Sequence, residues 1–265
     1  IGYLLIQVLK LEVVIFLFGT GSNGKSVIHE ILNGMFGSAL ISNHSLKDLF
    51  GSNSYYLSDL NDRLINYSSD DSMKTLSHGR FKQIASGEPI GVRQIYGHPF
   101  TMKKYAKLMV NLNRIDDANV EATIGFFRRM VFIPFEQTIT KEQQDKLLHK
   151  KILEDKAGVL NWILQGTQEV LQNREIFISQ KCFDFLENFK KESNLAHRFM
   201  EEYSLSHSAI DTIGFQYMYD KFIDFCKKEG EKAIPKKAFN NELRKLKFKD
   251  TRHSNGMVWH AKFNL

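Results

Sequence analysis

The residues with the clearest capacity for chemistry form one glycine-rich run, Gly19-Thr20-Gly21-Ser22-Asn23-Gly24-Lys25-Ser26, followed by Val27. The run matches the pattern G-x-x-x-x-G-K-[ST] without a gap. Its glycines let backbone N–H groups approach a phosphate chain, its lysine supplies a positive charge, and its serine offers a hydroxyl ligand for Mg²⁺. We therefore predict that this segment binds ATP, with Lys25 at the β- and γ-phosphates and Ser26 at Mg²⁺.

The segments on either side of the loop have the patterns that such a site requires. Val13 to Phe18 is β-branched and aromatic, which predicts a buried strand. Apolar residues after the loop recur at helical spacing, at Val27, Ile28, Ile31, Leu32, Met35 and Phe36. A strand, a glycine loop and a helix together point a helix N-terminus at phosphate, so we predict an α/β nucleotide-binding fold.

Further polar residues follow later predicted strands, first an acidic pair and then an amide. The strand predicted from Arg63 ends at Asp70 and Asp71, where one carboxylate can hold Mg²⁺ and the other can polarise an attacking water. A polar turn after a strand is the alternative explanation. The strand predicted over 107–112 ends at Asn113, whose amide can sense the γ-phosphate.

Two further features lie around Asn113. Arg128 and Arg129 precede the last predicted strand, where they can act as an arginine finger across a subunit boundary or merely cap the strand. A hairpin is predicted over 90–105, between the acidic pair and Asn113. Lys82, Arg93 and His98 lie in or near it and are candidate DNA ligands.

Composition narrows the class of protein. The chain has 265 residues, 43% hydrophobic and 25% charged, which is ordinary for a globular protein. No apolar run approaches the ~18 residues that span a membrane, and we expect no membrane association. The two cysteines, Cys182 and Cys226, form neither a zinc pattern nor a disulfide framework, which favours core thiols in a cytoplasmic protein.

The positive charge is concentrated at one end. Residues 227–265 hold eleven Lys/Arg and four Asp/Glu, a balance of 11 − 4 = +7, whereas the whole chain carries +6. Three helices are predicted near 194–203, 215–226 and 235–246, followed by a hairpin turning at 254–256. This pattern predicts a winged helix that binds duplex DNA, with four basic side chains facing outward from the third helix, Lys236, Lys237, Arg244 and Lys245.

Taken in order, these motifs resemble the superfamily 3 helicases, and most closely the phage- and plasmid-type primase-helicases, which also resemble the poxvirus replication NTPase. The resemblance implies an AAA+-like ATPase core over 1–140, a helical subdomain over 141–191 and a winged-helix domain over 192–265. It also implies a homo-oligomer, a hexameric ring around single-stranded DNA, and a primase domain upstream of Ile1.

The resemblance also assigns roles to single residues. Asp70 takes the main acidic position beside Mg²⁺, Asp71 is the adjacent acid, and Asn113 is the sensor. Arg129 is the better finger candidate, with Arg128 beside it, and His98 faces DNA from the hairpin turn. The strand before Asp70 departs from the family, because it reads Asn-Tyr-Ser-Ser where relatives have an aliphatic run.

These observations predict an ATP-dependent DNA helicase that replicates a phage, plasmid or integrated mobile element in a bacterial or phage-host cytoplasm. The alternative is a DNA-binding AAA+ ATPase switch, an origin initiator or loader that does not unwind DNA. A small-molecule kinase is disfavoured by the basic C-terminal end and the paired arginines.

Overall fold

The computed structural model describes residues 1–51, 54–69, 73, 76, 78–113, 124–254 and 256–264. Asp70 and Asp71 lie outside the described residues. The chain divides into two compact units, residues 1–189 and 190–265. The predicted helical segment that begins at residue 141 shares its unit with the sheet.

The first unit is organised around five parallel strands in the order β2-β3-β6-β1-β7. Their bounds are β1 (Val14–Phe18), β2 (Ile41–Ser42), β3 (Ile65–Ser68), β6 (Lys107–Leu112) and β7 (Met130–Pro134). This arrangement confirms the predicted α/β class with a central parallel sheet. The order inserts β6 between β1 and β3, so the carboxyl ends of these three strands are neighbours.

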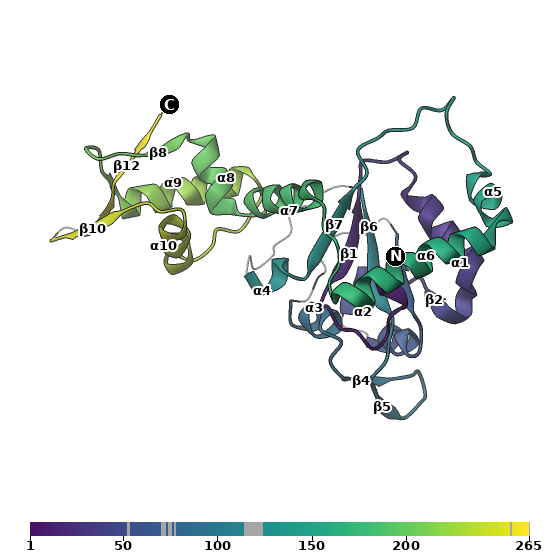
Figure 1. Cartoon of the computed structure of the whole chain (residues 1–265). Coiled ribbons are helices and arrows are strands. Elements are labelled where there is room, and N and C mark those ends of the chain that lie inside the picture. Colours follow the sequence, from purple (N-terminus) through teal and green to yellow (C-terminus); the bar gives the residue numbers. More distant parts are fainter. Residues whose placement is uncertain are drawn as a thin grey trace. The chain divides into compact units, whose positions relative to one another are not determined.

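Helices cover both faces of this sheet, as expected for parallel strands. One face packs against η1 (Gly2–Leu5), α1 (Lys25–Leu40) and α6 (Lys156–Asn173). The other packs against α2 (Leu46–Phe50), η2 (Ser54–Leu60), α3 (His78–Ala85), α4 (Ile124–Phe127) and α7 (Gln180–Glu192). In Figure 1, α1 and α6 lie on one side of the strands and α4 and α7 on the other. The short helix α5 (Leu148–Glu154) lies beside α1.

The period-2 alternation of the strands explains the two layers. Phe16 of β1 and Phe132 of β7 stack with ring centroids 5.0 Å apart on the second face. Ile15 and Leu17 point to the face that α1 covers. Buried aliphatic and aromatic side chains therefore fill both layers.

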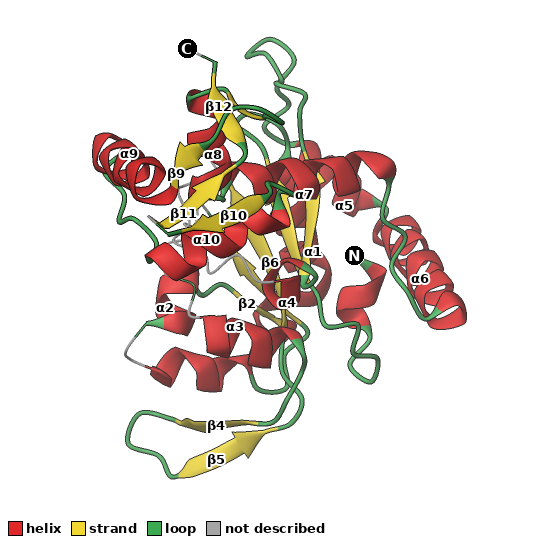
Figure 2. Ribbon diagram, turned by 90° about the vertical axis from the view of Figure 1, so that its left-hand side faces the viewer, coloured by secondary structure: helices red, strands yellow, loops and turns green. Residues whose placement is uncertain are grey.

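A separate hairpin extends from this unit. Strands β4 (Ile90–Arg93) and β5 (Pro99–Met102) pair antiparallel, with Arg93 opposite Pro99. Both ribbon views show the hairpin projecting away from the sheet (Figures 1 and 2). Ile90, Val92 and Met102 anchor its base in the main core.

The second unit has its own core, centred on Phe199, Phe222, Phe239 and Trp259. Its helices are α8 (Leu195–Glu202), α9 (Phe215–Lys228) and α10 (Lys236–Lys245). Its strands are β8 (Leu205–His207), β9 (Ile213–Gly214), β10 (Asp250–His253), β11 (Gly256–Trp259) and β12 (Ala261–Phe263). The predicted hairpin is present as β10–β11, and β9 adds a third strand beside β11. Beyond the hairpin, β12 pairs with β8, with Phe263 opposite Leu205.

Candidate nucleotide site

The glycine-rich loop joins the end of β1 to the start of α1. Gly21 and Gly24 have φ of +110° and +86°, values that glycine adopts without strain. A Cβ at Gly19 would lie 2.0 Å from Asn23 Nδ2 and 2.5 Å from the Phe135 carbonyl oxygen. The close packing of the loop therefore depends on glycine at these positions.

Lys25 is directed into the loop. The residue is only 3% exposed. Its Nζ donates to the Gly19 carbonyl at 2.5 Å and to Asn23 Oδ1 at 2.8 Å. These are acceptors of the loop itself, so the ammonium is held where a bound phosphate chain would lie.

Asn23 has a role that its place in the motif does not reveal. Its Oδ1 accepts from Lys25 Nζ, and its Nδ2 donates to the Phe135 carbonyl at 3.2 Å. The Ile139 amide donates to the Ser22 carbonyl at 2.7 Å, and the Phe135 amide to the Phe18 carbonyl at 2.6 Å. The segment after β7 thus braces the loop from outside, which no local pattern predicted.

The hydroxyl residues of the loop segment face solvent. Thr20, Ser22 and Ser26 are all exposed, and Ser26 lies in the first turn of α1. Backbone N–H groups at the start of a helix point along its axis toward solvent, and they favour an anion. Ser26 is therefore accessible from solvent, and its assignment to Mg²⁺ stays a prediction.

Asn113 lies beside the loop. Phe18 of β1 is paired with Leu112 of β6, and the Gly19 amide donates to the Leu112 carbonyl at 3.1 Å. Asn113 follows directly and is exposed. Because β6 also pairs with β3, with Val110 opposite Ser68, the segment that leads to Asp70 emerges at this same edge. We call this the carboxyl edge of the sheet.

The polar character of β3 has a structural explanation. Asn66 is fully buried; its Oδ1 accepts from Ser42 Oγ and from the His44 amide, both at 3.0 Å. Its Nδ2 donates to the His44 carbonyl at 2.9 Å, and Ser68 Oγ donates to the same carbonyl at 2.5 Å. Strand β2 has only two residues, so these side chains hold the 42–44 segment where the backbone ladder is too short.

Arg128 and Arg129 lie at the opposite, amino edge of the sheet. They precede Met130, which pairs with Val14 at the start of β1, and the Val14 amide donates to the Arg129 carbonyl at 2.8 Å. The five residues of β1 span roughly 17 Å at about 3.3 Å per residue. The structure therefore does not bring the arginines to the glycine-rich loop of their own chain.

The two arginines differ in environment. Arg129 is 8% exposed, and its guanidinium donates to Glu12 Oε2 at 2.8 Å, Ser86 Oγ at 3.0 Å and the Gly125 carbonyl at 2.5 Å. The side chain of Arg128 is 61% exposed and lies 3.2 Å from Glu12. We had ranked Arg129 ahead of Arg128 as a finger, yet in this chain Arg128 is the one with a guanidinium open to a neighbour.

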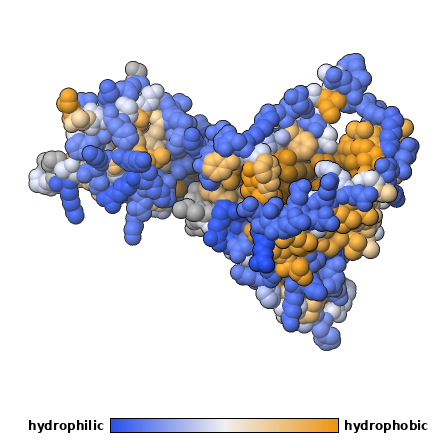
Figure 3. All heavy atoms as spheres, in the orientation of Figure 1, coloured by the Kyte–Doolittle hydropathy of each residue, from blue (hydrophilic) through white to orange (hydrophobic). Residues whose placement is uncertain are grey.

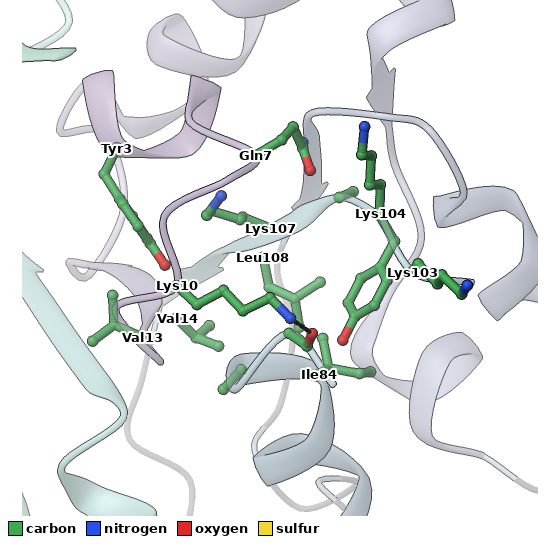
Figure 4. A pocket seen from close by; sticks show the side chains of 14 residues that line it. Tyr3, Gln7, Lys10, Val13, Val14, Ile84, Lys103, Lys104, Lys107 and Leu108 are labelled. Atoms are coloured by element: carbon green, nitrogen blue, oxygen red, sulfur yellow. Dashed lines mark hydrogen bonds between the residues drawn. The ribbon is translucent and has the colours of Figure 1, made fainter. Parts of the chain in front are cut away.

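A cavity of about 40 Å³ opens at this amino edge (Figure 4). Among the described residues, four lysines line it, Lys10, Lys103, Lys104 and Lys107, and no acidic residue does. Lys107 donates to the Ile6 carbonyl, its Nζ lies 4.8 Å from the centroid of the Tyr3 ring, and burial lowers its pKa to about 8. We call this the amino-edge cavity.

The candidate DNA ligands fall into separate groups. Arg93 and His98 are both exposed on the β4–β5 hairpin, whereas Lys82 is half-buried on α3. In the second unit Lys236, Lys237, Arg244 and Lys245 are all exposed on α10. On the face seen in Figure 3, that unit presents a largely hydrophilic surface.

Several of the α10 side chains have partners. Arg244 Nη2 lies 2.7 Å from Asp250 Oδ2, and this pairing raises the pKa of Arg244 and lowers that of Asp250. Lys245 lies 2.6 Å from Glu242. Lys236 donates to Gln216 Oε1 at 2.6 Å. Binding of phosphate by these three residues would therefore compete with contacts inside the unit.

The two cysteines differ in burial, because Cys182 is only half-buried. Cys226 is buried, and burial raises the pKa of its thiol to about 11, so the reactive thiolate is disfavoured at neutral pH. Among the described residues, no three His, Cys, Asp or Glu side chains gather as metal ligands. In the same part of the chain, every helix is too short or too polar to cross a membrane.

Comparisons with known proteins identify similar folds but say little about function. A profile of a family of unknown function, DUF5906, matches residues 17–129. No curated protein matches the chain. The solved apo structure of the NrS-1 C-terminal region is similar with a TM-score of 0.57 and 14% identity, over 99% of this chain and 70% of that one. A second form of the same region gives 0.56 and 14%, over 99% and 69%. At this identity the likeness shows a shared fold alone.

Proposed function

We propose that this protein is an ATP hydrolase of the superfamily 3 type, with an AAA+-like core, and that it acts as a replicative DNA helicase. The observation that carries the proposal is the carboxyl edge. There the phosphate loop with its inward-directed Lys25 lies beside Asn113, and the segment leading to Asp70 and Asp71 emerges one strand further along.

Each residue has one task in this proposal. Lys25 and the loop amides bind the β- and γ-phosphates, and the Ser26 hydroxyl with a carboxylate of Asp70 would hold Mg²⁺, which neutralises charge that develops on the phosphates. Asp71 polarises the attacking water and Asn113 orients it. Positioning and electrostatics of this kind supply most of the rate in phosphoryl transfer.

The placement of the arginines supports a homo-oligomer. Arg128 and Arg129 lie at the amino edge and the loop lies at the carboxyl edge, so an arginine can complete an ATP site only from a neighbouring chain. Head-to-tail contacts between copies generate closed rings. In the proposed ring, each contact brings the amino edge of one chain to the carboxyl edge of the next. We propose a hexamer, in line with the resemblance.

Two surfaces are proposed for DNA. The β4–β5 hairpin with Arg93 and His98 would contact single-stranded DNA in the ring. The second unit would act as a winged helix, since three helices and a small antiparallel sheet present the basic helix α10 to duplex DNA. The setting would be replication of a phage, plasmid or mobile element in a bacterial cytoplasm, with a primase domain upstream.

The test is a strand-displacement assay on a forked DNA substrate, run with ATP and with the Lys25→Ala variant as the inactive control. We expect displacement and DNA-stimulated ATP hydrolysis by the wild type and neither by the variant. ATP hydrolysis without displacement would favour the origin initiator or loader instead. Hydrolysis that DNA does not stimulate would overturn both readings.

A further inference from the structure

The tip of the β4–β5 hairpin carries an aromatic side chain with no packing role. Tyr96 is fully exposed, at 101% of its reference area, and the neighbouring Ile95 is 64% exposed. A tyrosine ring in this position stabilises nothing inside its own chain, because it removes no apolar surface from water. We therefore expect this residue, at the end of a projecting hairpin, to contact a partner outside its own chain.

The backbone at Tyr96 adds a second observation. Its φ is +59°, in the left-handed region that bulky residues rarely adopt. The next residue is Gly97, whose amide donates to the Gln94 carbonyl at 3.0 Å and closes the turn. Glycine at position 96 would adopt this backbone without strain, so the structure holds a tyrosine at a conformational cost.

The turn is held in one orientation. Arg93 Nε donates to the Gly97 carbonyl at 3.0 Å, across the base of the turn. Below it, Ile90 and Val92 are buried in the core of the first unit, at 4% exposed each. The hairpin is therefore anchored at its base and presents the Tyr96 ring on a braced tip.

The surroundings of the ring attract a polyanion. Between Pro89 and Asn113 the sequence contains no Asp or Glu, but it contains Arg93, His98, Lys103, Lys104 and Lys107. Lys103 and Lys104 directly follow β5 and line the amino-edge cavity at the base of the hairpin (Figure 4). The nearest acid along the chain is Glu88, which precedes the hairpin.

We propose that the Tyr96 ring stacks on a nucleobase of single-stranded DNA, while Arg93 and His98 contact the flanking phosphates. An exposed aromatic side chain among basic residues is the arrangement by which proteins bind single strands without reading sequence. Single strands suit this site because their bases are free to stack, whereas the bases of a duplex already stack on each other. The inference deepens the proposed function, on whose DNA-contacting hairpin it rests.

The experiment measures equilibrium binding of the full chain, without nucleotide, to two labelled strands of equal length and charge. One is a thymidine tract and the other is an abasic tract. We expect the wild type to bind the thymidine tract more tightly. Tyr96→Gly should weaken thymidine binding by about fivefold to a hundredfold, the range for one stacked base, and should leave abasic binding unchanged. Tyr96→Phe should keep the wild-type affinity.

Two controls separate stacking from other roles. Tyr96→Gly should unfold at the same or a higher urea concentration than the wild type, because glycine tolerates the positive φ, so weaker binding would not reflect misfolding. Ile95→Gly removes an exposed apolar side chain from the same tip but no ring, and should leave thymidine affinity unchanged. The salt dependence of binding should be unchanged in Tyr96→Gly and shallower in Arg93→Gln.

Equal loss on both tracts, or an equal effect of Ile95→Gly, would overturn the stacking assignment. So would thymidine binding by Tyr96→Gly at the wild-type level. No ATP is present, so loss of helicase activity in the fork assay leaves this result standing. Conversely, unwinding by Tyr96→Gly with unchanged thymidine affinity would refute the inference and keep the proposed function.

Discussion

The guanidinium of Arg129 donates to Glu12 Oε2 at 2.8 Å, at the end of β1 that is opposite the phosphate loop. The same guanidinium binds Ser86 Oγ and the Gly125 carbonyl, so it connects three segments of one chain. Its neighbour Arg128 shares only Glu12 among these partners and is mainly exposed. Adjacent arginines of this kind should therefore respond differently to mutation.

We expect Arg129→Ala to lower the free energy of unfolding by roughly 1–3 kcal/mol, because it leaves buried polar groups without their partner. This range of free energy takes into account that the side chain of Glu12 is 43% exposed. Arg128→Ala should change stability by less than about 0.5 kcal/mol. Urea unfolding of both variants measures the difference, and equal losses would contradict the distinct environments.

Arg128→Ala should bind ATP nearly as well as the wild type but hydrolyse it about 10³–10⁵-fold more slowly, if Arg128 completes a neighbour's site. Mixing this variant with Lys25→Ala should restore part of the activity, because some interfaces then pair an intact loop with an intact arginine. No recovery in rings shown to contain both variants would argue against a shared site. Slow hydrolysis by a folded Arg129→Ala, with Arg128→Ala active, would return the role to Arg129.

A conservative change at each of the two acidic residues tests which one contributes more to ATP hydrolysis. Asp70→Asn should cost orders of magnitude in the rate of ATP hydrolysis and Asp71→Asn less, since Asp70 is assigned to Mg²⁺ and Asp71 to water. Each change keeps the size of the side chain and removes only the charge. Measuring kcat at saturating Mg²⁺ tests the assignment, and the reverse order would shift it by one residue.

Helix α10 should contribute to duplex binding through charge. Lys237→Gln is expected to weaken binding to duplexes of any sequence and to reduce the slope of log K against log salt by about 0.9, the value for one phosphate contact. Lys150→Gln, at an exposed lysine of α5, is the matched control and should change neither quantity. An unchanged slope in Lys237→Gln would remove that lysine from the DNA surface.

Lys107 should make stability depend on pH. Burial lowers its pKa in the folded protein from 10.5 to about 8, so between these values the unfolded chain binds more protons and stability rises with pH. At pH 7 the partly buried ammonium costs stability, and Lys107→Met should be more stable than the wild type by roughly 1 kcal/mol after allowance for solvent screening.

That advantage should shrink as pH rises from about 7 to about 9.5. Urea unfolding across this range measures it, with Lys104→Met, at an exposed lysine of the same cavity, as the control. A constant difference between Lys107→Met and the wild type would show that the ammonium is as well solvated in the folded protein as in the unfolded chain.

Local patterns were enough to place many elements of both units. The glycine run, the buried strand before it and the amphipathic helix after it are encoded within about thirty residues, and β7 begins where the sequence predicts, directly after Arg129. Helices α8, α9 and α10 likewise follow from apolar side chains at helical spacing. These features depend on neighbours in sequence, which a single chain displays directly.

Other features depended on contacts between distant segments. The two-residue strand β9 has no local signal and exists because Trp259 and Val258 offer it a ladder. The polar residues of β3 broke the expected aliphatic pattern because Asn66 and Ser68 bind the backbone of His44, more than twenty positions earlier. Neither pairing can be read from spacing alone.

The functional residues divide in the same way. The sequence by itself determined that a glycine-rich loop, an amide and two arginines are present, because residue type and order along the chain carry that information. Only the tertiary structure decided that Asn113 lies beside the loop while Arg128 and Arg129 lie at the far edge, and that Arg129 is buried against Glu12. Strand order and side-chain burial arise from the packing of the whole unit, and that packing is what separates a contact within one chain from a contact between chains.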